Sequence, residues 1–203
     1  MMPERAIFLD KDGTLIENVP YNVDPSKIQF CEGAIEAVRS LFNASYRIFI
    51  ITNQSGVAHG YFPEQKLAGV EMALRDRLAA VGVTLAGFYY CPHHAAGTVA
   101  AYALDCECRK PKPGMLLQAA QEHAIDLTRA WFIGDILNDV EAGRSAGCRT
   151  ILIDNGNETE WHLCRSRLPH HVVLNLMDAA NVILAIDRQP SLPAAPPYPA
   201  LSV

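Results

Sequence analysis

The sequence lacks long hydrophobic runs, internal repeats and a surplus of positive charge. No apolar stretch approaches the roughly 18 residues of a membrane span, so we expect no membrane partner. The apolar run in the amino-terminal stretch MMPERAIFLD is too short for a signal peptide, which favours a cytoplasmic location. A formal net charge of −5 argues against a nucleic-acid partner.

The cysteine content bears on metal binding, and the chain length bears on the number of domains. Six cysteines in a cytoplasmic chain are more often thiols or metal ligands than disulfides. With 203 residues, 50% of them hydrophobic, the chain is long enough for one domain with a substantial core and too short for two comfortable ones. We therefore expect a single-domain protein and a monomer.

Short apolar runs alternate with segments of helical periodicity. The expected strands are 6–10, 47–52, 87–91, 130–135, 150–154 and 171–175, and the expected helices are 33–44, 63–82, 113–125, 138–147 and 177–186. Pro63 and Pro113 are expected in the first turns of their helices. Such an alternation predicts a doubly wound, Rossmann-like α/β fold with a buried parallel sheet. The domain is expected to cover residues 1–188, followed by a proline-rich, extended or disordered tail, 189–203.

Polar groups follow the predicted strands, where ligands of open α/β sheets bind. The set consists of Asp10 and Asp12 after the first strand, Thr52 and Asn53 at the second, Arg109 and Lys110 closing the loop after the third, and Asp135 and Asp139 after the fourth. A single carboxylate in such a place most often caps a turn or a helix. The ordered set indicates one common site.

These residue types suit phosphoryl transfer. Carboxylates hold a hard cation such as Mg²⁺, and a carboxylate can itself attack phosphorus to form an aspartyl phosphate. A lysine and backbone N–H groups can bind the charged phosphoryl oxygens. Two aspartates one residue apart, such as Asp10 and Asp12, can divide the roles of nucleophile and general acid.

The segments DKDGT, TNQSG, CRKPKPG and GDILND, in this order, resemble the four motifs of the haloacid dehalogenase superfamily of phosphatases. The resemblance extends over about residues 5–186 and implies a capless fold, in which no second domain covers the site. More narrowly, ITNQSGVAHGYF together with YYCPHH and CECRKPKPGM is similar to members that remove the C7 phosphate from a heptose 1,7-bisphosphate on the route to nucleotide-activated heptose.

The resemblance implies roles for individual residues. Asp10 is the expected nucleophile, Asp12 the acid and base, and Mg²⁺ is expected at the Asp10 carboxylate, the Asp12 backbone carbonyl and Asp135. Ile136 stands where related sequences often carry a lysine, and Asp139 either orients the site or caps the following helix. The expected phosphate- and substrate-binding residues are Asn18, Val19, Pro20, Tyr21, Thr52, Asn53, Gln54, Ser55, Arg109 and Lys110.

A second candidate metal site lies in the loop 91–108. Cys91, His93, Cys106 and Cys108 offer thiolate and imidazole ligands, which select Zn²⁺ over Mg²⁺, and four protein ligands are typical of a structural site. The spacing is tighter than in most zinc sites, and the family resemblance strengthens this interpretation. His94 is an alternative to His93, which the one-residue spacing favours, and the spacing of Cys106 and Cys108 is poor for a redox pair.

Four other functions compete with a sugar-bisphosphate phosphatase. A histidinol-phosphate phosphatase has a similar zinc loop, and other small sugar phosphates are possible substrates. A polynucleotide 3′-phosphatase is disfavoured by the acidic charge. A zinc-loop binding module on an inactive hydrolase scaffold is disfavoured because Asp10, Asp12, Lys110 and Asp135 are all present. We expect a Mg²⁺-dependent phosphatase that acts on a small sugar bisphosphate.

Overall fold

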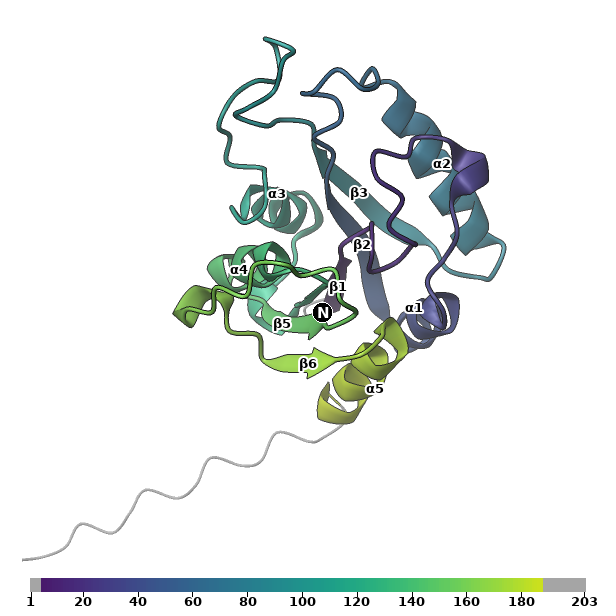
Figure 1. The fold of residues 1–203 in the computed structure, drawn as a ribbon. Coiled ribbons are helices and arrows are strands. Elements are labelled where there is room, and N and C mark those ends of the chain that lie inside the picture. The colour runs from purple at the N-terminus through teal and green to yellow at the C-terminus, as the bar shows by residue number, and fades with distance from the viewer. Residues whose placement is uncertain (1–4, 188–203) are drawn as a thin grey trace, which may run out of the picture.

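The structure is a computed structural model that describes residues 5–187, and it contains a six-stranded sheet flanked by helices (Figure 1). All neighbouring strands are parallel, and their order is β3-β2-β1-β4-β5-β6. The strands are β1 (Arg5–Leu9), β2 (Tyr46–Asn53), β3 (Leu85–Cys91), β4 (Trp131–Gly134), β5 (Arg149–Ile153) and β6 (His171–Val173). The helices are α1 (Ala34–Asn43), α2 (Lys66–Ala79), α3 (Gly114–His123), α4 (Leu137–Ala146) and α5 (Leu176–Asp187), with short 3₁₀ helices at Pro25–Lys27, Leu127–Arg129 and Arg165–Arg167.

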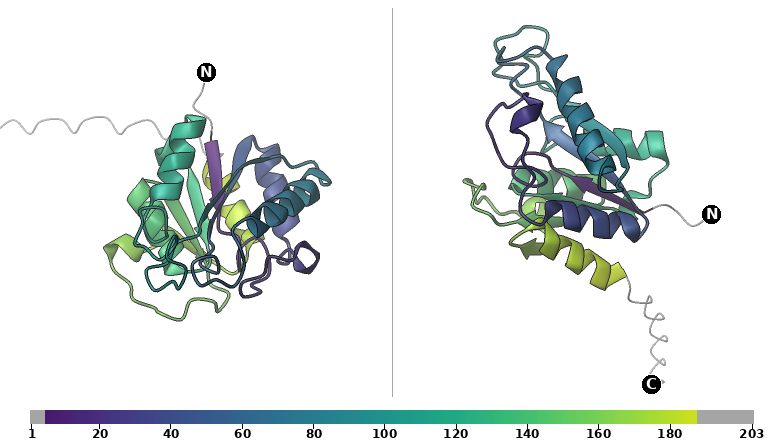
Figure 2. Two further views of the ribbon diagram at one scale, coloured as in Figure 1. Left: turned by 90° about the horizontal axis from the view of Figure 1, so that it is seen from above. Right: turned by 90° about the vertical axis from the view of Figure 1, so that its right-hand side faces the viewer.

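The central strands are apolar on both faces because helices cover both faces. In β1, Ile7 and Leu9 join the core cluster shared with α1, α2 and α5, whereas Ala6 and Phe8 join the cluster shared with α3 and α4. Successive side chains of a strand point to opposite faces, so both sets must be hydrophobic. Figure 2 shows the resulting three layers, helix, sheet and helix.

The predicted architecture is confirmed, and two helix starts differ from expectation. All six strands and the five main helices occupy their expected places. However, α2 begins at Lys66, and Pro63 lies in the preceding turn, where its carbonyl accepts a hydrogen bond from the Lys66 N–H at 3.0 Å. Pro113 is the cap residue immediately before α3. The proline-rich segment 189–203 lies outside the described residues.

The sheet order places the polar strand ends at one edge. Strands β1, β2 and β4 lie side by side at its centre, and the Asp10 N–H bonds the Ile133 carbonyl of β4 at 2.9 Å. Within residues 5–187 no second domain covers this edge, as the resemblance implied. None of the helices in this range has the length and apolar character that crossing a membrane requires.

Candidate active site

Lys110 lies buried between two aspartates at the carboxyl edge of the sheet. Its Nζ is 2.5 Å from Asp10 Oδ1 and 2.6 Å from Asp139 Oδ1, and it also donates to the Ile51 carbonyl at 3.1 Å. Burial alone disfavours the ammonium, but the two carboxylates outweigh it and raise the pKa of Lys110. The lysine is therefore charged and fixed beside Asp10.

Asp139 makes both of the contacts that the sequence left as alternatives. Its Oδ2 accepts a hydrogen bond from the Ile136 N–H at 3.3 Å, which caps α4, and its Oδ1 faces Lys110. Gly134 makes room for it, because an added Cβ would lie 2.3 Å from the Asp139 carboxylate. Asp139 thus caps the helix and orients the lysine.

Asp135 is held against the loop that follows β1. Thr14 Oγ1 donates to its Oδ1 at 3.2 Å, and Asn157 Nδ2 donates to its Oδ2 at 2.7 Å. Gly13, with a φ of 88°, allows this approach, because a Cβ there would lie 2.1 Å from Asp135 Oδ2. The glycine of DKDGT is therefore required both by its backbone conformation and by the closeness of Asp135.

The acids of this site suit a divalent cation. Carboxylate oxygens of Asp10, Asp135 and Asp139 lie within 4.8 Å of one another. Burial, with the neighbouring Asp10 and Asp139, raises the pKa of Asp135 to about 8, and burial raises that of Asp139 to about 6. Three buried acids and one lysine leave a net charge of −2 when ionised, which a hard divalent ion would balance.

Asp12 lies beside this cluster and is partly open to solvent. Lys11 Nζ is 3.0 Å from its Oδ2, and Gln54 Nε2 donates to the same oxygen at 3.1 Å and to Thr52 Oγ1 at 2.9 Å. Burial raises the pKa of Asp12, and Asp10 adds to this effect while Lys11 opposes it. Asp12 can therefore exchange a proton with a group in the adjoining pocket.

A pocket of about 310 Å³ opens next to Asp12. It joins the two segments expected to bind substrate, since its lining consists of Asp12, Asn18, Val19, Pro20, Tyr21, Asn22, Asn53, Gln54, Ser55 and Gly56. The ring of Tyr21, one of its lining residues, meets that of Tyr61 edge to face, 4.6 Å between centroids, and Tyr21 adopts a positive φ of 56°. Segments that follow β1 and β2 thus form a common recess for a small polar molecule.

The side chains of Arg109 and Lys110 have different surroundings. Lys110 is directed into the acidic cluster, whereas Arg109 is half-buried and donates through its NH1 group to the His93 carbonyl at 3.3 Å. The backbone of Lys110 is held by Asn53, which donates to its carbonyl and accepts from its N–H, both at 3.1 Å. The adjacent basic residues therefore do not form one cationic cluster.

The four candidate zinc ligands meet in one place. The sulfur atom of Cys91 lies 3.4 Å from that of Cys106 and 3.0 Å from that of Cys108, and His93 Nδ1 lies 3.3 Å from the Cys108 sulfur. A tetrahedral ion with Zn–S bonds of about 2.3 Å sets ligand sulfurs about 3.7 Å apart, so the group is of the right size and slightly contracted. His94 lies outside it and accepts a hydrogen bond from the Ala96 N–H.

The cysteine loop packs on the segment after β2, and both rise side by side in Figure 1. The N–H groups of Thr98 and Val99 both donate to the Ala58 carbonyl, at 2.8 and 2.9 Å. Gly97 permits this contact, because a Cβ there would lie 2.8 Å from the Ala58 carbonyl. The loop therefore depends on the metal cluster at one end and on Ala58 at the other.

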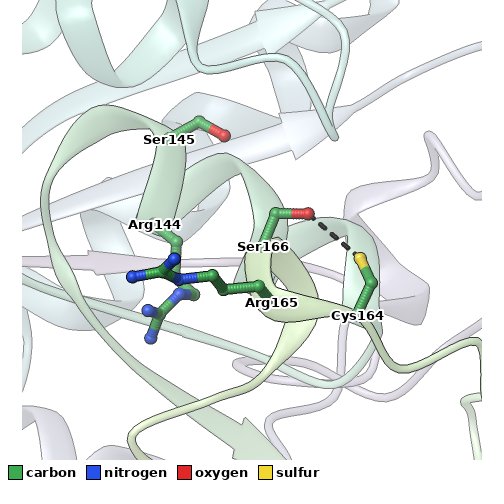
Figure 3. Close-up of a pocket in the computed structure, with 5 residues that line it drawn as sticks. All are labelled: Arg144, Ser145, Cys164, Arg165 and Ser166. Carbon is green, nitrogen blue, oxygen red and sulfur yellow. Dashed lines mark hydrogen bonds between the residues drawn. The ribbon is translucent and has the colours of Figure 1, made fainter.

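Another cavity, of about 560 Å³, lies away from these residues (Figure 3). Arg144, Ser145, Cys164, Arg165 and Ser166 line it, and Cys164 contacts Ser166 at 3.1 Å. None of the predicted catalytic or substrate-binding residues is in its lining. The acidic edge, with its convergent polar groups, is the better candidate for an active site.

Several residues that contact the candidate site were given no role in the sequence analysis. Lys11 and Thr14 lie within DKDGT, whose short length would have allowed their identification. Asn157 follows β5, and the rule that strand ends carry function could have identified it. Glu158 accepts from the Leu137 N–H at 2.5 Å, a contact between segments 21 residues apart that no local pattern indicates.

Comparison with known proteins agrees with this geometry. The model of the HAD-hydrolase-like family matches residues 107–179. A D-glycero-β-D-manno-heptose-1,7-bisphosphate 7-phosphatase from Pasteurella multocida is 44% identical over 154 residues, covering 75% of this chain and 83% of the relative. The protein of the same name from Photorhabdus laumondii is 42% identical over 184 residues, covering 90% and 97%.

A solved structure extends the comparison to three dimensions. The D,D-heptose 1,7-bisphosphate phosphatase from B. bronchiseptica, in complex with magnesium and phosphate, superposes with a TM-score of 0.74 at 27% identity, covering 90% of this chain and 99% of that one. The parallel sheet and its acidic edge thus define a phosphatase of the HAD-like hydrolase class. Within that class, the chain belongs to the family of D-glycero-β-D-manno-heptose-1,7-bisphosphate 7-phosphatases.

Proposed function

We propose that the protein hydrolyses the C7 phosphate of D-glycero-β-D-manno-heptose 1,7-bisphosphate through a phosphoryl intermediate on Asp10. The observation that supports this most directly is the contact of Lys110 with Asp10, 2.5 Å, next to a recess lined by Asp12 and residues 18–21. Relatives of this name are 42–44% identical to the chain over the aligned residues. A cytoplasmic location and a monomeric state stay predictions.

In the first step, a carboxylate oxygen of Asp10 attacks the phosphorus atom at C7. The new O–P bond forms as the bond from phosphorus to the sugar oxygen breaks, and Asp12 gives its proton to that oxygen. Lys110 stabilises the negative charge on the transferring group, because its ammonium is already fixed between Asp10 and Asp139. The three N–H donors of Lys110 are engaged by Asp10, Asp139 and the Ile51 carbonyl, so a direct bond to a phosphoryl oxygen would replace one of these contacts.

In the second step, water attacks the phosphorus atom of the aspartyl phosphate. Asp12, now a carboxylate, accepts a proton from that water, and the O–P bond to Asp10 breaks to release phosphate. Lys11 and Gln54 hold the Asp12 Oδ2 atom in both steps, which keeps the carboxyl group at the mouth of the pocket. One residue thus acts as acid and then as base.

Magnesium would be held by the carboxylates of Asp10 and Asp135 and by the Asp12 backbone carbonyl. The buried, hydrogen-bonded Asp135 and the net charge of the acids fit a hard divalent cation. When bound, the ion offsets negative charge on the phosphoryl oxygens and aligns them with the nucleophile. Zinc at Cys91, His93, Cys106 and Cys108 would be structural, because four protein ligands leave no open position.

Arg109 would recognise the second phosphate of the substrate, at C1. Its guanidinium is anchored to the His93 carbonyl and is not paired with the acids around Lys110, so donors of its planar fork are free to bind a dianion. The residues of the pocket, Asn18 to Tyr21 and Asn53 to Ser55, would surround the sugar between the two phosphates.

The test is phosphate release from a panel of substrates with Mg²⁺ present: the heptose 1,7-bisphosphate, histidinol phosphate, other sugar monophosphates and an aryl phosphate. The heptose bisphosphate is expected to give the highest kcat/KM, and Asp10→Asn is expected to lower its turnover by at least about 1,000-fold. A higher kcat/KM for histidinol phosphate, or turnover of Asp10→Asn within about tenfold of the wild type, would overturn the proposal.

A further inference from the structure

The segment that follows β5 reaches back to the loop of Asp10 and Asp12. Three of its side chains contact the site: Asn155 Nδ2 donates to the Gly13 carbonyl at 2.7 Å, Asn157 Nδ2 donates to Asp135 Oδ2 at 2.7 Å, and Glu158 accepts from the Leu137 N–H. The partners belong to different parts of the site, the turn after β1, the acid after β4 and the start of α4. The segment 155–158 therefore links these three parts of the site to one another.

The conformation of this segment is suited to the contact. Gly156 adopts a φ of 88°, and the Asn157 N–H donates to Asn155 Oδ1 at 3.3 Å, so the chain turns between the two asparagines. The turn directs the Asn155 carboxamide to the Gly13 carbonyl and the Asn157 carboxamide to Asp135. The turn thus sets the positions of the two donors.

Asn157 completes the surroundings of Asp135. Thr14 donates to one carboxylate oxygen and Asn157 to the other, so rotation of the carboxylate is restrained from both sides. The carboxamide also packs on Gly13, since a Cβ there would lie 2.5 Å from Asn157 Nδ2. The same residue therefore contacts the acid and the peptide turn next to Asp12.

We infer that Asn157 is a positioning residue for the divalent-metal site: it orients the Asp135 carboxylate and, with Asn155, fixes the turn that carries the Asp12 carbonyl. This inference relies on the metal site of the proposed function. Groups that hydrogen-bond to metal ligands commonly contribute 10–100-fold to metal affinity, because they fix the ligand in its binding orientation. Asn157 and Asn155 also line a polar cavity of about 490 Å³ beside Gly13.

Because of that cavity, a positioning role of Asn157 can be distinguished from a structural role by experiment. Asn157 is only half-buried, so water can reach Asp135 when the carboxamide is removed. Water would satisfy the Asp135 oxygen without fixing its direction. The thermal midpoint of unfolding should therefore change little on substitution, while the affinity for the ion should fall.

The experiment compares wild type, Asn157→Leu and Asn157→Ala by direct binding of Mn²⁺, followed by electron paramagnetic resonance. Leucine has nearly the shape of asparagine without its donor, and alanine leaves room for water. Both variants should bind Mn²⁺ about tenfold more weakly, the low end of the usual range. Asn181→Leu, at an exposed asparagine of α5, is the matched control and should bind like the wild type.

The outcomes separate this inference from the proposed function. Equal Mn²⁺ affinity in wild type and the Asn157 variants, or an equal loss in Asn181→Leu, overturns the positioning role. A wild-type protein that binds Mn²⁺ but releases no phosphate from the heptose bisphosphate overturns the proposed substrate and leaves the positioning role standing. A wild type that binds no divalent ion overturns both.

Discussion

Asn53 and Lys110 exchange two hydrogen bonds: the Asn53 carboxamide donates to the Lys110 carbonyl and accepts from the Lys110 N–H, both at 3.1 Å. The last residue of β2 thereby fixes the backbone of a lysine 57 positions later. Both polar groups of the Asn53 side chain face the backbone of Lys110. Asn53 therefore acts on a bound phosphoryl group indirectly, by fixing the position of Lys110.

Replacing Asn53 by alanine should therefore weaken catalysis at the reacting phosphate. We expect Asn53→Ala to lower kcat/KM by about 10–100-fold, because a small displacement of Lys110 removes its contact with the transferring group. The loss should be equal for the heptose bisphosphate and an aryl phosphate, measured by phosphate release. Asn43→Ala, at the exposed end of α1, is the control. A loss confined to the bisphosphate would contradict this role.

Asp12→Asn should discriminate between leaving groups. A sugar alkoxide needs a proton from Asp12 as it departs, whereas an aryl oxide leaves without one. We expect turnover of the heptose bisphosphate to fall by about 100- to 10,000-fold and turnover of the aryl phosphate to fall much less. Parallel measurement of kcat on both substrates checks this, and equal losses would show that Asp12 is not the acid.

Cys106→Ser should release zinc and lower activity indirectly. The substitution removes one of four ligands, so about one zinc ion per chain should be lost by elemental analysis. The loop that ends in Arg109 and Lys110 then loses its anchor, and turnover should fall while Mg²⁺ dependence persists. Cys164→Ser changes an exposed thiol far from the cluster and should retain metal and activity. Wild-type protein purified without chelator and free of zinc would refute the structural site.

Arg109→Ala should change substrate specificity more than the rate of the chemical step. Loss of a charge-assisted contact to the C1 phosphate is expected to lower kcat/KM for the bisphosphate by about 10–100-fold and to leave an aryl phosphate nearly unaffected. Arg129→Ala, at an exposed arginine of a short 3₁₀ helix, is the matched control. Equal losses on the two substrates would place Arg109 at the reacting phosphate instead.

The sequence predicted the sheet well because each central strand is apolar on both faces. Ile7 and Leu9 pack on one layer and Ala6 and Phe8 on the other, which produces the continuous run that marks a buried parallel strand. Helix starts were predicted less well. Pro63 fits a first helical turn, but the chain makes a separate turn before α2 begins at Lys66, and proline alone does not distinguish the two.

The site was predictable where its residues lie at strand ends. Asp10 follows β1 and Asp135 follows β4, and the pairing of these two strands brings the acids together. The sequence did not reveal that the Arg109 and Lys110 side chains have separate partners, because residue spacing does not determine side-chain direction in an irregular loop. Nor did it reveal Asn157, whose contact with Asp135 depends on a turn that forms only in the folded chain.

The different surroundings of Arg109 and Lys110 have an evolutionary consequence. The Lys110 side chain is fixed between Asp10 and Asp139, whereas Arg109 donates a hydrogen bond to the His93 carbonyl of the cysteine loop. With Arg109 in the proposed role, a change at position 109 would alter the choice of substrate without disturbing the acids around Lys110. A capless enzyme that recognises its substrate in this way would be able to acquire new substrates by substitutions at its rim.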